Sequence, residues 1–128
     1  MALAPPERCE ECGFEAASVT PVDAAETIRA FGRRYRAPLS RFLPGEDGQA
    51  LVRRRPDATT WSALEYAAHM RDVLALWGWA LNKALTEDRV VVIGEEEMSS
   101  LAIVHKLAHE GHHHLLDIGR VLRTVRGR

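Results

Sequence analysis

A regular spacing of apolar residues near the end of the chain limits the possible fold more than any other feature. From about residue 99 to residue 126, apolar side chains recur at steps of three and four, as at Leu101, Val104 and Ala108 and again through Leu115, Leu122 and Val125. A period near 3.6 residues places these side chains on one face of an α-helix. The sequence therefore predicts a long C-terminal helix that packs against other helices.

Two further segments show the same spacing. Apolar residues recur in this way from Pro21 to about residue 42, and proline is favoured in the first turn of a helix. Ser62 followed by Glu65 forms a capping-box pattern, which predicts a second long helix up to about Leu85. Residues 90 to 93 read as a short extended segment, but no alternation is strong enough for a sheet. We predict an all-α fold with three long helices, divided into an irregular arm (1–20) and a helical bundle domain (21–128).

The overall composition excludes several classes of function. The 128 residues suit one domain, and 17 Lys and Arg nearly balance 18 Asp and Glu. Proteins that bind nucleic acids or acidic membranes usually carry a basic surplus, so we expect no nucleic-acid or membrane partner. No apolar run approaches the ~18 residues of a membrane span, and the first residues lack signal-peptide features. We therefore expect a cytoplasmic protein with reduced cysteines.

Histidines are concentrated in the last predicted helix, where four of them occupy residues 109 to 114. Side chains four positions apart lie above one another on a helix, so His105, His109 and His113 offer two convergent pairs. His112 gives an alternative pair with His109 at a spacing of three. Neutral imidazole is the commonest metal ligand in proteins, so the histidines are candidate ligands. The alternative interpretation is that they lie on a solvated flank of the helix. The cluster is therefore a candidate for part of a metal site.

The facing ligand is predicted on the second helix. His69 shares a helical face with apolar residues such as Val73 and Ala80, which points it toward the core. A single core histidine is more often a hydrogen-bonded structural residue, but together with the HxxxH spacing it favours metal binding. Residues 109 to 113 also resemble the HExxH zinc motif of metalloproteases. A protease would need a cleft strand and a third ligand downstream, and neither is visible.

The only two cysteines, Cys9 and Cys12, form a single CxxC in the N-terminal arm. One such pair is a weak zinc signal by itself. With two of the late histidines, however, it would complete a tetrahedral Cys2His2 site that ties the arm onto the bundle. A pair of unbound thiols and a redox dithiol are the alternatives, and the second lacks the βαβ context of thioredoxin-like proteins.

Two sequence blocks resemble a known group of metalloproteins. Residues 61–69 (WSALEYAAH) and 109–118 (HEGHHHLLDI) are similar to the second-helix and last-helix motifs of the DinB/YfiT-like superfamily, and CxxCGF at residues 9–14 resembles an arm of its actinobacterial members. The resemblance implies a helical bundle in which His69, His109 and His113 hold a divalent metal with open positions. Zinc is the first expectation, with nickel, iron and manganese as alternatives. We expect Asp72 and Asp117 to orient the imidazoles.

The resemblance implies a metal-dependent S-transferase that uses a low-molecular-weight thiol, or a hydrolase, with no further catalytic residue assigned. The family has four bundle helices, and the segment between the second and last helices is too short here for another one. A partner chain in a homodimer could supply the fourth-helix position. The alternative function is a non-catalytic, zinc-stabilised dimeric module with a Cys/His site. The spacing leaves open whether His105 or His112 replaces His113 as a ligand.

Overall fold

The computed structural model describes residues 8–86, 90–93 and 96–127 and consists mainly of helices. Its elements are a 3-10 turn Ala16–Ser18, helices α1 (Pro21–Ser40), α2 (Gly48–Arg53), α3 (Ala63–Thr86) and α4 (Ser100–Arg126), and strands β1 (Val90–Ile93) and β2 (Glu96–Ser99). The predicted all-α bundle with three long helices is confirmed. The short helix α2 lies between the first two predicted long helices, in a segment for which the sequence analysis predicts no helix.

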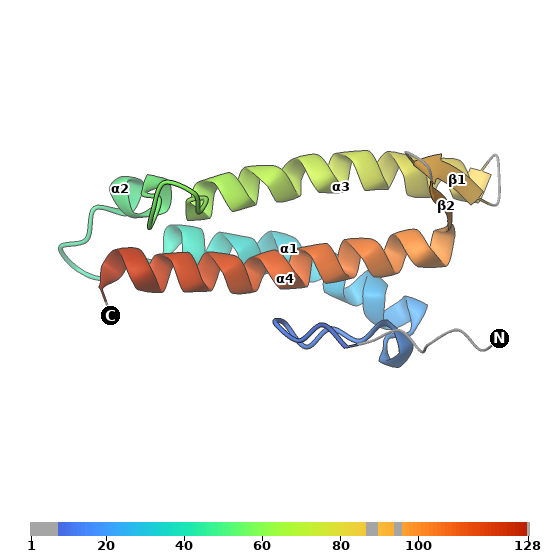
Figure 1. Ribbon diagram of the computed structural model, residues 1–128, viewed down its shortest axis with the longest axis horizontal. Coiled ribbons are helices and arrows are strands. Elements are labelled where there is room, and N and C mark those ends of the chain that lie inside the picture. Colours follow the sequence, from blue (N-terminus) through green and yellow to red (C-terminus); the bar gives the residue numbers. More distant parts are fainter. Residues whose placement is uncertain (1–7, 87–89, 94–95, 128) are drawn as a thin grey trace.

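The long helices form a bundle with its connections at both ends (Figure 1). Helices α3 and α4 lie side by side, and α1 packs against α4. The extended segment predicted at residues 90–93 is confirmed as β1, which pairs antiparallel with β2, with Val91 opposite Met98. This hairpin carries the chain from α3 into α4, while α2 lies at the opposite end of the bundle.

The helix starts follow from local hydrogen bonds. Before α3, the backbone N–H of Glu65 donates to Ser62 Oγ at 3.1 Å, and the N–H of Ser62 donates to Glu65 Oε1 at 3.2 Å. This is the predicted capping box. Thr20 and Asp23 form an equivalent reciprocal pair at the start of α1, directly before Pro21. These bonds satisfy backbone N–H groups that a helix cannot pair internally.

A close approach between α1 and α4 fixes the rotation of the histidine-bearing helix. Gly111 is buried, and a Cβ added there would lie 2.1 Å from two atoms of the Phe31 ring. One turn further along α1, the Tyr35 hydroxyl donates a 2.6 Å hydrogen bond to the Gly111 carbonyl. Only glycine leaves room for the Phe31 ring here. The residues adjacent to Gly111 on α4 are thereby held in a defined orientation.

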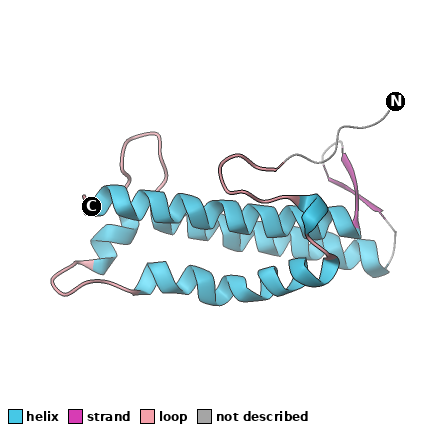
Figure 2. Cartoon of the chain, turned by 90° about the horizontal axis from the view of Figure 1, so that it is seen from below, coloured by secondary structure: helices cyan, strands magenta, loops and turns pink. Residues whose placement is uncertain are grey.

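The described part of the N-terminal arm, residues 8–20, lies along the outside of the bundle, with its loop over the middle of α4 (Figure 2). His105 Nε2 lies 2.9 Å from the Val19 carbonyl, and His112 Nε2 lies 2.9 Å from the Cys12 carbonyl. Residues 1–7 of the predicted arm lie outside the described residues. Within the described ranges, no helix is long and apolar enough to cross a membrane.

Candidate metal centre

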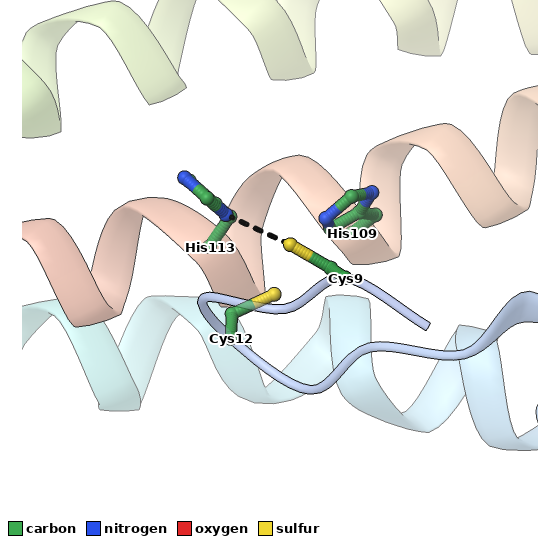
Figure 3. A group of neighbouring side chains, drawn as sticks. All are labelled: Cys9, Cys12, His109 and His113. Carbon is green, nitrogen blue, oxygen red and sulfur yellow. Dashed lines mark hydrogen bonds between the residues drawn. The ribbon is translucent and has the colours of Figure 1, made fainter. Parts of the chain in front are cut away.

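The two cysteines lie on a tight turn of the arm. The N–H of Gly13 donates to the Cys9 carbonyl at 2.8 Å, and the N–H of Cys9 donates to the Phe14 carbonyl at 2.8 Å. Gly13 has φ +77°, a left-handed backbone conformation that residues other than glycine rarely adopt. The turn brings both thiols to within 4.8 Å of each other, and Figure 3 shows them near α4.

Helix α4 supplies two imidazoles to the same place. His109 and His113 lie on successive turns, and Cys9 Sγ is 3.6 Å from His113 Nδ1. One ligand atom from each of Cys9, Cys12, His109 and His113 lies within 4.8 Å of the other three. All four residues are partly buried. Phe14 stacks on the His109 ring, with centroids 5.0 Å apart, and so shields one side of the cluster.

These four residues fit a tetrahedral zinc ion. Zn–S bonds of about 2.3 Å and Zn–N bonds of about 2.0–2.1 Å imply a sulfur-to-nitrogen edge of about 3.5 Å in a tetrahedron. The observed Cys9 to His113 separation of 3.6 Å matches this edge. His109 Nε2 is buried without a hydrogen-bond partner among the described residues. A buried nitrogen without a partner is costly, so this ring gains from a ligand bond.

The protein perturbs the two thiols differently. Hydrogen bonds to the thiolate, first from the Cys12 backbone N–H and then from the His109 ring, lower the pKa of Cys9 to about 6. Burial raises the pKa of Cys12, and repulsion from a Cys9 thiolate adds to this increase. A bound cation would favour both thiolates, because metal ligation requires deprotonated cysteine.

The other two histidines on this side of α4 have a different role. A nitrogen that donates to a carbonyl carries a proton and cannot bind a metal through the same atom. His105 and His112 use Nε2 in this way, bonding to Val19 and Cys12 respectively. Neither of them belongs to a group of described residues close enough to share an ion. They hold the arm against α4 instead.

A second group of potential ligands lies between α3 and α4. Ligand atoms of His69, Glu110 and His114 lie within 4.8 Å of one another. His114 Nε2 is 3.1 Å from Glu110 Oε2, and the His69 and His114 ring centroids are 5.0 Å apart. The sequence predictions did not include Glu110 or His114 as ligands. Their spacing of four residues was the available signal, because carboxylates and imidazoles are both ligands of divalent metals.

The structure therefore divides the predicted set of His69, His109 and His113. It brings His109 and His113 together with the cysteines, and it places His69 with Glu110 and His114. The reason is geometric, because successive helix residues are rotated by about 100°. His113 consequently faces the arm, whereas His114 faces α3.

The two predicted orienting carboxylates have different surroundings. Asp117 Oδ2 is 3.0 Å from His114 Nδ1 and 3.8 Å from His113 Nε2, so this carboxylate touches both groups. Asp72 pairs with Arg71 at 3.3 Å, and its side chain is 72% exposed. The structure thus places Asp117, but not Asp72, beside imidazoles. This difference follows from the outward direction of Asp72 on α3.

A pocket of about 310 Å³ is lined by members of both groups. Its lining comprises Cys9, His109, Glu110, His113 and His114. Burial opposes ionisation of Glu110, but hydrogen bonds and charge from Lys106 and His114 outweigh it and lower the pKa of this carboxyl. An ionised carboxylate on the cavity wall suits cation binding.

No protein-family model, curated protein or solved structure matches this chain.

Proposed function

We propose that this chain is a zinc-binding helical protein in which a Cys2His2 site fastens the N-terminal arm to α4. The observation that carries the proposal is the mutual proximity of four ligand atoms, from Cys9, Cys12, His109 and His113, within 4.8 Å. Two come from the arm and two from α4, so one ion would join segments that are distant in the sequence.

The donor set favours a structural zinc ion. Mixed thiolate and imidazole donors select zinc over hard cations such as magnesium and calcium, which prefer oxygen. Four protein ligands fill a tetrahedral shell and leave no position for a substrate. Metal ligation would add to the free energy that orders the arm on α4, together with the hydrogen bonds of His105 and His112 to Val19 and Cys12.

Elemental analysis of the purified chain tests this proposal. We expect the Cys2His2 site to hold one zinc ion in the wild type and in His105→Ala, which removes an α4 histidine outside the ligand set. Cys9→Ala/Cys12→Ala and His109→Ala should each contain about one zinc ion per chain less than the wild type, because only this site loses its ligands. Cobalt substitution should produce thiolate-to-cobalt charge-transfer absorption in the wild type only if cysteines are ligands. Full zinc content in the double cysteine variant, with helical circular dichroism retained, would refute the proposal.

We propose as a second function the metal-dependent chemistry implied by the DinB-like resemblance. The specific observation is the group of His69, Glu110 and His114, which offers three ligands, two of which, Glu110 and His114, line the 310 Å³ cavity. Three protein ligands with an open position are typical of a catalytic centre. A metal bound there would lower the pKa of a bound thiol or water and generate a nucleophile. Asp117 would orient His114 through Nδ1.

The cysteine-free variant Cys9→Ala/Cys12→Ala allows a direct test of this open centre. In the cobalt-substituted variant, thiolate-to-cobalt absorption can arise only from an added thiol, for which we would use 2-mercaptoethanol. We expect this absorption to appear on titration and to be lost in the same variant carrying His69→Ala. If the variant binds no cobalt, or gives the same spectrum after His69→Ala, the second function is wrong.

The homodimer expected from the resemblance stays a prediction. Apolar side chains for such a contact are present on the outer face of α3, where Leu76 is 50% and Trp79 57% exposed.

A further inference from the structure

We infer that Cys9 and Cys12 form a site of reversible oxidation by peroxide, in which a disulfide replaces the zinc–thiolate bonds. The inference rests on the proposed zinc function and adds its regulation. It assigns to the arm a chemical state in which the metal is released and the attachment to α4 is weakened.

The geometry of the turn favours the disulfide. The two Sγ atoms already lie within 4.8 Å of each other and need to approach only to a bond length of about 2.05 Å. The Gly13 to Cys9 hydrogen bond closes the turn on which both cysteines lie. The sequence has no other cysteine, so every intrachain disulfide must join these two residues.

Both thiols are accessible to a small oxidant. Cys9 and Cys12 are only partly buried. Cys9 lines the 310 Å³ cavity and also a neighbouring surface hollow of about 640 Å³ that includes Phe14 and His105. Hydrogen peroxide is little larger than water and fits either space. The disulfide therefore does not require the bundle to open.

The reaction balances in two steps. The Cys9 thiolate attacks one oxygen of hydrogen peroxide, the O–O bond breaks, a sulfenic acid forms, and the hydroxide that leaves takes a proton from solvent to become water. The Cys12 thiolate then attacks the sulfenic sulfur, the S–S bond forms, the S–O bond breaks, and a second hydroxide leaves and is protonated to water. In total, two zinc-bound thiolates are oxidised to a disulfide, one peroxide and two protons become two waters, and the zinc ion is released. A dithiol reductant reverses the change by exchange.

Oxidation would remove half of the zinc ligands. A disulfide sulfur is not a thiolate and no longer holds zinc, because the thiolate is the ligand form of cysteine. His109 and His113 alone leave the tetrahedral shell half empty. The arm would then depend on the hydrogen bonds of His105 and His112 to Val19 and Cys12.

The experiment treats the zinc-loaded full chain with hydrogen peroxide and follows zinc release with a chromogenic chelator and intact mass by mass spectrometry. We expect about one zinc released per chain, together with a loss of two hydrogen atoms in mass. Dithiothreitol followed by zinc should restore both. The control Cys12→Ala should show no such loss of mass, and Gly119→Ala, which changes an exposed α4 residue, should behave as the wild type.

The outcomes separate this inference from the zinc proposal. A chain that binds no zinc but still forms the disulfide contradicts the zinc proposal, and with it the regulatory role of oxidation. A chain that binds zinc but keeps its mass and metal under peroxide overturns the oxidation site alone. The same measurement is made on the zinc-free chain. A mass that increases by oxygen atoms, without formation of the disulfide, would also overturn the oxidation site.

Discussion

Replacing Gly111 by alanine should destabilise the bundle, although alanine is the better helix former. The added Cβ would lie 2.1 Å from two Phe31 ring atoms and 2.8 Å from a third. Phe31 is only 2% exposed, so its ring has no solvent-filled space to enter. We therefore expect α1 and α4 to separate locally and to disturb the hydrogen bond from Tyr35 to the Gly111 carbonyl.

The size of the effect follows from two opposing contributions. Overpacking a core costs about 1–3 kcal/mol, and this overlap belongs at the upper end. Alanine in place of glycine within a helix contributes roughly 1 kcal/mol of stability. The expected net loss in the free energy of unfolding is about 2 kcal/mol. For a domain of this length, this loss lowers Tm by roughly 8 °C.

The assay is thermal and urea unfolding of the zinc-loaded and chelator-treated chain, followed by circular dichroism. Gly119→Ala is the matched control, because Gly119 lies in the same helix, is exposed, and has no atom within 4 Å of an added Cβ. It should raise stability by about 1 kcal/mol. Phe31→Leu should rescue part of the Gly111→Ala loss, because the two sites interact directly. Equal shifts for the two glycine variants would refute the reasoning.

Two further predictions concern hydrogen bonds beyond the metal ligands. Burial raises the pKa of Tyr35, whose hydroxyl donates a hydrogen bond to the Gly111 carbonyl. Tyr35→Phe removes this bond and should lower the free energy of unfolding, measured in urea, by about 1 kcal/mol. An unchanged free energy would contradict a role for the bond. The Arg55 guanidinium and the Ser62 N–H lower the pKa of Glu65 from 4.5 to about 2. The stabilisation of the folded chain by these two interactions with ionised Glu65 should therefore be complete above pH 4.5 and be lost as pH falls toward 2. The difference in urea midpoint between wild type and Glu65→Gln should follow this course, and a difference independent of pH would contradict it.

Most of the bundle could be predicted because its signals are local. The starts at Pro21 and after Ser62 depend on residues three or four positions away, and the apolar spacing of α4 is visible along the chain itself. Helix α2 was missed because its six residues, Gly48–Arg53, are too few to show a period. Its start depends on an Asp47 side chain that accepts from the Ala50 N–H.

The candidate metal site was only partly predictable, because its assembly depends on long-range contacts. The arm has no periodicity, and its place on α4 is set by pairs such as His112 with Cys12, 100 positions apart. A Cys2His2 combination was foreseen, but not which two histidines would join the cysteines. His113 and its neighbour His114 belong to different ligand groups. Predicting this requires knowledge of which flank of α4 faces α3.

The position of the two cysteines has a consequence for synthesis of the chain. Cys12 leaves the ribosome before His109, with 96 residues between them in the sequence. At a translation rate of roughly 5–20 residues per second, His109 is synthesised about 5–20 s after Cys12. During that interval the Cys/His cluster cannot form, because both of its histidines lie on α4. The four-residue cluster can therefore form only in chains that have been translated through His113.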